Sequence, residues 1–293
     1  MKNSIKIFCL SAVVSMQFLA SCTNNVDSNE PLPLPPVGGY DNSDDIAKSN
    51  LIVKFGFEDN INDSFSGATG GVATNVSYVE GIKGKAYQGT ATTFAGYSAV
   101  NAKLSGLKSI TNSVWIKTSA GAGAQCLFML PRTSDFFGNI FVLIDGSSNG
   151  NMNLKVHIQK TGAAWSGQWM EHVGANALVN MYGDWKHLVW TYDAATSKYK
   201  VYVNGEKLNL PDGFTNRYAS DPASGGLPLG GLVNSDVSKF IIGGFQQHLG
   251  TPWGTPEPWM VPYTGLMDEL RIYDIALTDS EVRFLYKLEK TKR

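Results

Sequence analysis

The strongest constraint on the fold is the stretch between residues 184 and 208, DWKHLVWTYDAATSKYKVYVNGEKL. Its first part, residues 185–192, mixes aromatic, β-branched and polar side chains in the way that suits a half-buried strand. Residues 198–203 alternate between a face of Tyr and Val and a face that carries two lysines. Asn204-Gly205 supplies the two positive φ angles of a type I′ turn. The stretch therefore predicts three consecutive antiparallel strands joined by hairpins.

Further short apolar runs are separated by clusters of Gly, Pro, Asn and Ser. They cover residues 51–57, 110–118, 125–130, 139–145 and 154–159. Short strands at regular spacing, with barely any helical periodicity, predict an all-β sandwich of two antiparallel sheets. One helix is expected near the end of the chain, because Thr278 and Glu281 form a capping box before an apolar stripe. We expect this helix to cover one end of the sandwich.

Several motifs resemble laminin-G-like, concanavalin A-type jelly-roll domains of the lectin/glucanase superfamily. They are W-x-H-L-V-x-T-Y-D followed by K-V-Y-V-N-G, then TGLMDELRIY with ALTDSE at 264–281, G-x-x-G-x-A at 81–86, and the strand 51–57 with NDS at 62–64. The resemblance covers roughly residues 48–293 and implies a two-sheet antiparallel jelly roll with one short C-terminal helix. The family includes lectins, carbohydrate-binding modules, adhesion domains and some hydrolases, so the resemblance specifies the fold far better than the function.

The N-terminus has the pattern of a targeting segment. Residues 1–21 combine two lysines with an apolar run, and Leu19-Ala20-Ser21-Cys22 resembles a bacterial lipobox. Ordinary signal cleavage and a transmembrane helix are the alternatives, although the apolar run is short for a span. Residues 22–47 are polar and Pro-rich, which predicts a semi-rigid spacer before a domain at 48–293. This arrangement resembles Bacteroides-type surface lipoproteins and implies an outer-membrane anchor at an acylated Cys22.

The charge balance argues against a nucleic-acid partner, and the cysteine content argues against a disulfide. The chain has 24 Lys and Arg against 25 Asp and Glu and no basic cluster, so we expect no nucleic-acid partner. Of its three cysteines, Cys9 lies in the signal and Cys22 is the lipidation site. Cys126 is then left alone, which excludes an intramolecular disulfide in the mature chain and predicts a small buried hydrophobic side chain.

Four tryptophans lie in regions rich in Gly and Pro, outside the alternating strands: Trp165, Trp169, Trp253 and Trp259. Sugar sites use flat aromatic rings with a few polar groups, so we expect these rings to bind carbohydrate, with Arg217 and His248 as polar partners. The alternative is that the rings only pack long loops against the domain. Trp115, Trp185 and Trp190 belong to strand patterns and are expected in the core.

The family resemblance also implies a structural Ca²⁺ between the first and last strands. The expected ligands are Glu58, Asp63 and Asp268, because hard cations take carboxylate and carbonyl oxygens. The loop at 62–67, NDSFSG, departs from the family's fuller polar turn. The alternative is that these carboxylates accept backbone N–H bonds in turns.

Catalytic motifs are weak in this sequence. The E-x-D-x-x-E spacing of retaining jelly-roll glycosidases does not occur, and the adjacent Asp268 and Glu269 point to opposite faces of a strand. The leading hypothesis is therefore non-catalytic binding of poly- or oligosaccharide on the cell surface, beside a glycan importer and a hydrolase. Two alternatives stay open: a glycoside hydrolase or lyase with carboxylates distant in sequence, and a protein-binding adhesion module.

Overall fold

The computed structural model describes residues 34–65, 71–97, 102–237 and 239–293. The expected signal segment and Cys22 lie outside the described residues. The chain divides into two compact units, residues 1–35 and 36–293. Only residues 34 and 35 of the first unit are described, and the second unit contains all the helices and strands below.

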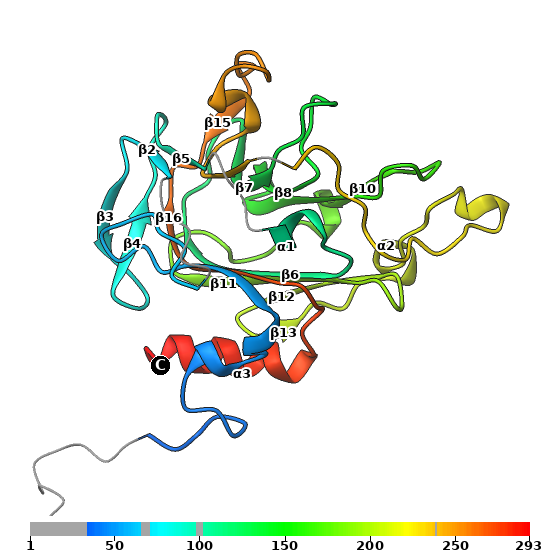
Figure 1. Ribbon diagram of the computed structural model, residues 1–293. Helices are drawn as coiled ribbons and strands as arrows, with labels where there is room; N and C mark the ends of the chain where they lie inside the picture. The colour runs from blue at the N-terminus through cyan, green and yellow to red at the C-terminus, as the bar shows by residue number, and fades with distance from the viewer. Residues whose placement is uncertain (1–33, 66–70, 98–101, 238) are drawn as a thin grey trace, which may run out of the picture. The chain divides into compact units, whose positions relative to one another are not determined.

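Two sheets of eight strands each, stacked face to face, form the second unit within the described residues (Figure 1). The first, here called sheet 1, has the order β13 (Glu206–Lys207), β12 (Lys198–Val203), β11 (Lys186–Asp193), β6 (Ile110–Lys117), β16 (Leu266–Tyr273), β4 (Lys85–Gln88) and β3 (Ser77–Glu80), with β1 (Leu51–Phe55) also paired to β16. Sheet 2 has the order β10 (Gly167–His172), β9 (Asn151–Gln159), β8 (Ile140–Ser148), β7 (Ala124–Leu130), β14 (Phe240–Ile242), β5 (Phe94–Tyr97) and β2 (Val72–Thr74). A short strand, β15 (Met260–Pro262), pairs with β7 in parallel, and every other pairing is antiparallel. The predicted antiparallel sandwich is confirmed.

The meander that dominates the sequence is present as predicted. Strands β11 and β12 pair from Leu188 opposite Val203 to Asp193 opposite Lys198. Asn204 and Gly205 have φ angles of 53° and 78°, as a type I′ turn requires, and β13 returns along β12. This local turn chemistry fixes the register of β12 against β13.

The main core lies between the two sheets and follows the two-residue period of the strands. On β9, Leu154, Val156 and Ile158 point inward, whereas the alternating residues point to the outer face. Trp190 of β11 contributes from the opposite sheet and is fully buried. Burying each such side chain stabilises the fold by about 1.5–3 kcal/mol relative to leaving it exposed.

The C-terminal helix α3 (Asp279–Lys290) begins with the predicted capping box of Thr278 and Glu281. Its buried residues Val282, Leu285 and Leu288 pack against side chains of β11, β12 and β16. The helix therefore covers the outer face of sheet 1, below those strands in Figure 1, rather than one end of the sandwich. The reason is that this outer face carries apolar residues, such as Val189 and Tyr202, which need a cover.

The remaining elements are short. They are the helices α1 (Ala102–Ser105) and α2 (Asp212–Thr215), and the 3-10 turns at Ser43–Asp45, Lys48–Asn50, Gly174–Asn176, Pro222–Ser224 and Gln246–Leu249. The compact unit begins at Pro36, ahead of the expected domain start at residue 48. Ile46 explains this difference, because it is fully buried in the cluster under α3.

Candidate ligand-binding face

The outer face of sheet 2 carries a row of three aromatic rings. Register places Phe141 of β8 opposite His157 of β9, and His157 opposite Trp169 of β10. The ring centroids are 4.7 Å apart for Phe141 and His157, and 4.9 Å apart for His157 and Trp169. Burial lowers the pKa of His157 to about 3, so its ring is neutral at physiological pH.

Three further rings extend this row outward. Phe136 and Phe137 come from the turn between β7 and β8, and Trp259 directly precedes β15. The centroid of Phe137 lies 5.2 Å from Trp169 and 6.5 Å from Trp259, and that of Phe136 lies 6.3 Å from Trp259. Phe136 and Trp259 are 45% and 40% exposed. We call Phe136, Phe137, Trp169 and Trp259 the aromatic platform.

Hydrogen bonds fix the turn that carries Phe136 and Phe137, from the 3-10 turn after β14 and from Arg132 within the same turn. Gln246 Nε2 donates to the carbonyl of Phe136 at 3.0 Å, and Gln247 Nε2 donates to the same oxygen at 2.8 Å. Arg132 Nε donates to the carbonyl of Phe137 at 2.8 Å. Rings held in this way lose little conformational freedom when a ligand binds.

Charged groups lie beside Trp169 on the outer face, at the next pair of opposed residues on that face. Lys155 of β9 is opposite Glu171 of β10, and its Nζ lies 2.8 Å from Asp145 and 3.0 Å from Glu171. Burial lowers the pKa of Lys155, but the bonds from both carboxylates outweigh it and raise the pKa overall. All three side chains reach solvent, so they can form hydrogen bonds with a polar ligand beside the platform.

Two of the predicted ligand-binding tryptophans thus meet on one face. Trp259 lies in an irregular segment, as predicted. The expectation that Trp169 lies in a loop is wrong, because it belongs to the edge strand β10. Met170 and His172 are buried on the inner face of this strand. The alternation is hard to recognise in the sequence, because polar residues flank it.

Trp253 and His248 lie beside a different part of sheet 2. His248 lines a cavity of about 300 Å³ together with residues of β2, β5 and the segment before β14. Trp253 donates its Nε1 proton to the carbonyl of Arg132 at 2.7 Å, and Lys239 Nζ lies 5.9 Å from its ring centroid. The ring of Phe245 connects the two areas, 5.7 Å from Trp259 and 6.1 Å from His248.

Trp165 and Arg217 are not brought into the platform. Trp165 is 45% exposed in the β9–β10 hairpin, where its backbone N–H donates to Ala219 at 3.0 Å. It makes no ring contact with the described residues. The guanidinium of Arg217 donates to three main-chain carbonyls, those of Gly213, Asn216 and Trp169, which gives it a role in fixing the loop.

Sequence reasoning missed Phe136 and Phe137. The available signal was a pair of adjacent aromatic residues in a short polar turn, PRTSDFFGN, between two apolar strands. Such a turn does not need aromatic residues for its own geometry.

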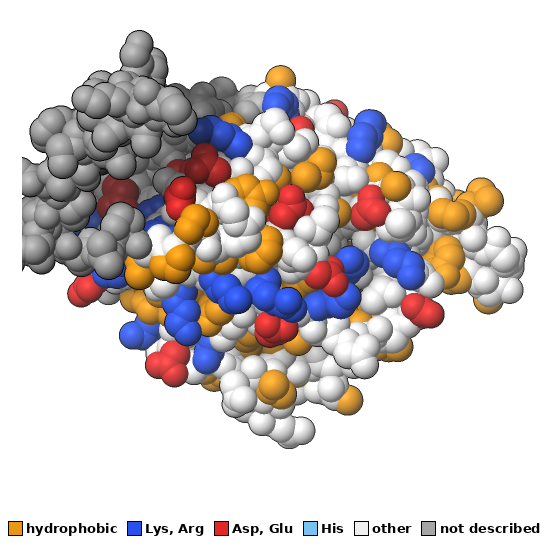
Figure 2. Space-filling model, turned by 90° about the horizontal axis from the view of Figure 1, so that it is seen from below, with side chains coloured by type: hydrophobic (Ala, Val, Ile, Leu, Met, Phe, Trp, Pro, Cys, Tyr) orange, Lys and Arg blue, Asp and Glu red, His pale blue; other side chains and the backbone are white. Residues whose placement is uncertain are grey.

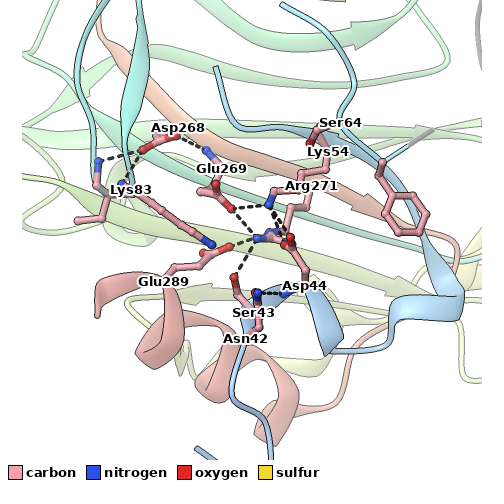
Figure 3. Close-up of polar contacts among 12 residues, drawn as sticks. Asn42, Ser43, Asp44, Lys54, Ser64, Lys83, Asp268, Glu269, Arg271 and Glu289 are labelled. Carbon is pink, nitrogen blue, oxygen red and sulfur yellow. Dashed lines mark hydrogen bonds and ion pairs between the residues drawn. The ribbon is translucent and has the colours of Figure 1, made fainter. Parts of the chain in front are cut away.

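The region predicted to bind calcium holds its carboxylates differently (Figure 3). Asp268 accepts backbone N–H bonds from Ile82, Lys83 and Glu269, at 2.9, 3.0 and 2.7 Å. Among the described residues, no three His, Cys, Asp or Glu side chains come together to hold a metal ion. Calcium binding by these carboxylates therefore stays a prediction.

The other two expected ligands are engaged in the same way. Asp63 Oδ1 accepts from the N–H groups of Lys54 and Phe65, both at 3.0 Å. Glu58 Oε2 accepts from the N–H of Lys85 at 3.1 Å. These contacts correspond to the alternative interpretation of turn-forming carboxylates.

Protein cations neutralise the neighbouring acidic cluster. Arg271 is fully buried, and its guanidinium binds Glu269, Glu289 at 2.7 Å and Asp44 at 2.6 Å (Figure 3). Lys54 adds an ion pair to Asp44 at 2.7 Å. Burial raises the pKa of Asp44, but Arg271 and Lys54 outweigh it and lower the pKa to about 2. This network ties the N-terminal segment and α3 to β16.

The sequence G-S-S-N-G at 146–150 matches the G-x-S-x-G motif of a nucleophile elbow but does not have its structure. It lies in the β8–β9 hairpin, with φ angles of 51° at Asn149 and 79° at Gly150. Ser148 Oγ donates to Asn153 at 2.8 Å. An elbow needs a strand-to-helix turn and a neighbouring base, so this serine has no catalytic context.

On the side of the molecule seen in Figure 2, Lys and Arg side chains form a band. Lys200 and Lys207 both bind Asp279, at 3.0 and 2.6 Å, and Arg283 lies 3.4 Å from Glu206. Paired cations of this kind offer little to a polyanion. No helix among the described residues has the length and apolar character needed to cross a membrane.

Comparison with known proteins gives one family. The model described as the concanavalin A-like lectin/glucanases superfamily matches residues 91–283. No curated protein matches the chain.

Solved structures with the same fold are distant in sequence. Domain 4 of the GH43 extracellular arabinanase AbnA from Geobacillus stearothermophilus, in complex with arabinotriose, is 20% identical with a TM-score of 0.50, covering 80% of this chain and 98% of that one. The binding domain of botulinum neurotoxin DC in complex with SialylT is 11% identical with a TM-score of 0.54, covering 83% of this chain and 52% of that one. A structure of botulinum neurotoxin type C, whose cell entry depends on two ganglioside molecules, is 9% identical with a TM-score of 0.53, covering 82% and 51%. At these identities the likeness shows the fold alone.

Proposed function

Since this chain belongs to the concanavalin A-like lectin/glucanases superfamily, we propose that it binds poly- or oligosaccharide without catalysing a reaction. The observation that carries the proposal is the aromatic platform on the outer face of sheet 2. Two of its rings, Phe136 and Trp259, are substantially exposed, and the turn that carries Phe136 is fixed by hydrogen bonds from Gln246 and Gln247. The arabinotriose complex of AbnA domain 4 is consistent with sugar binding on this fold.

The platform has the chemistry that a sugar ring needs. Pyranose rings present C–H groups on one face, which pack on flat aromatic surfaces, and hydroxyls at the edge, which hydrogen-bond to polar side chains. Trp259 and Phe136 supply two exposed rings, tilted by 44° to each other. Lys155, Asp145 and Glu171 supply polar partners next to Trp169.

Affinity electrophoresis tests this proposal with a panel of arabinan, xylan, mixed-linkage glucan and polygalacturonate. Loss of a central aromatic anchor costs about 2 kcal/mol, so Trp259→Ala is expected to raise Kd about 30-fold. Trp165→Ala is the matched control, because it removes an indole of similar exposure outside the platform. Equal binding by wild type and Trp259→Ala would contradict the proposal, as would release of reducing sugar from any of these polymers.

We also propose that Cys22 is acylated and holds the domain at the outer membrane, close to a glycan importer and a hydrolase. The lipobox-like residues before Cys22 and the Pro-rich spacer after it support this location. Labelling with radioactive palmitate is expected in wild type and not in Cys22→Ser. Surface proteolysis of intact cells then distinguishes the outer face from the periplasmic face.

A further inference from the structure

The cavity beside His248, at the outer face of sheet 2, is separate from the platform. It has a volume of about 300 Å³, at the lower end of the range for small-molecule sites, which is enough for one sugar residue. Its lining comes from four parts of the chain: Val72, Phe94, Gly96, Tyr97, Lys239, His248 and Leu249. None of these residues contributes to the platform.

The cavity contains a cation without a counter-charge. Lys239 is half-buried, and it forms no ion pair with any described carboxylate. Its ammonium lies 5.9 Å from the centroid of the Trp253 ring. Among the described residues, no Asp or Glu lines the cavity. A partly buried positive charge with no acidic partner favours a negatively charged ligand.

His248 adds a second hydrogen-bond donor. Nδ1 of His248 lies 3.1 Å from the backbone nitrogen of Phe245 and 3.3 Å from the carbonyl oxygen of Phe245. In the tautomer that accepts from the N–H, which is the shorter contact, the proton of the neutral ring is on Nε2. Nε2 has no hydrogen-bond partner among the described residues. Burial lowers the pKa of His248, so the neutral form is present at physiological pH. Lys239 and His248 thus both offer donors to a ligand that accepts.

The walls of the cavity suit the apolar face of a sugar. The ring of Phe94 packs on His248 with centroids 5.4 Å apart, and Tyr97 is almost fully buried behind it. Gly96 allows Leu249 to approach closely, because a Cβ there would lie 2.5 Å from Leu249 Cδ2. The site combines an aromatic wall with two donors and no acid.

We propose that this cavity is a subsite for a negatively charged sugar residue, whose anionic group binds Lys239 and the Nε2–H of His248. The proposal rests on the proposed carbohydrate binding and names the class of glycan: one that carries carboxylate or sulfate groups. Phe245 contacts the rings of both His248 and Trp259, so one buried side chain connects the lining of the cavity to the platform.

Calorimetry with matched polymers tests the proposal at low salt. The carboxylate probes are polygalacturonate, alginate and hyaluronan, and each is compared with its carboxyl-reduced form. Dextran sulfate is compared with dextran to test whether sulfate supplies the charge. We expect at least one acidic member to bind about tenfold more tightly than its neutral partner. Lys239→Gln should abolish this preference and Lys239→Arg should keep it. Lys117→Gln, which alters an exposed lysine in a different cavity, should also keep it.

The two proposals fail in distinguishable ways. Equal binding of every acidic and neutral pair, or an unchanged preference in Lys239→Gln, overturns the anionic subsite. If such a result is accompanied by binding that Trp259→Ala abolishes, the platform stands and only the subsite falls. Loss of charge preference in Lys239→Gln with unchanged binding of neutral polymers supports both.

Discussion

The buried network around Arg271 gives the sharpest prediction about stability. Glu289 is fully buried, and its two oxygens accept from Arg271 Nε and Trp115 Nε1, each at 2.7 Å. The substitution Glu289→Gln keeps the shape of the side chain but leaves one accepting oxygen for two donors. Burial raises the pKa of Glu289 to about 7, so above that pH the substitution also removes one negative charge from the surroundings of a guanidinium with no solvent exposure.

Removing one partner from a buried ion pair costs about 3–5 kcal/mol. Arg271 keeps Glu269 and Asp44, so we expect the lower end, about 3 kcal/mol. For a domain of this size, each kcal/mol lowers the melting temperature by about 2–4 °C, so the expected decrease is about 6–12 °C.

Urea unfolding and a thermal melt measure this change. The matched control is Glu206→Gln, the same substitution in an exposed ion pair with Arg283, where the glutamate side chain is 71% exposed. We expect the control to cost less than about 1 kcal/mol. Equal free energies of unfolding for Glu289→Gln and Glu206→Gln would show that the buried network does not stabilise the fold.

Two further predictions concern the same region. The pKa of Asp44 is about 2 in the folded chain, below its unfolded value, so its contribution to stability is complete above about pH 4 and is lost as the pH falls towards 2. Between pH 4 and pH 2, Asp44→Asn should lose less free energy of unfolding than the wild type. The difference should be less than about 1 kcal/mol, because the Asp44 side chain is 37% exposed. Identical pH profiles of the two proteins would refute this prediction. Adding EDTA tests the predicted calcium site: the melting temperature stays unchanged if Glu58, Asp63 and Asp268 serve only as acceptors of backbone N–H bonds. A decrease that disappears in Asp268→Asn would instead identify a metal site.

Features that depend on neighbouring residues could be predicted from the sequence. Asn204-Gly205 determines its turn through φ angles that few other residue pairs adopt, and Thr278 with Glu281 caps α3 within one helical turn. Trp190 was correctly expected in the core, because the strand pattern around it is unambiguous.

Features that depend on distant residues could not be predicted in this way. Arg271 and Asp44 are 227 positions apart, and nothing local to either residue indicates the pair. The platform joins Phe137, Trp169 and Trp259 only because β10 and the segment before β15 converge on the same face. Trp165 has the same kind of sequence context as Trp259, yet the fold keeps it outside the platform.

Indole N–H NMR signals test the central claim most directly. The chain has seven tryptophans, and Trp115 and Trp190 are buried internal controls. During titration with the tightest-binding oligosaccharide, we expect the signals of Trp169 and Trp259 to shift while those of Trp115, Trp190 and Trp165 stay in place. Shifts confined to Trp165, or saturable binding that leaves Trp169 and Trp259 unchanged, would contradict carbohydrate binding at the aromatic platform.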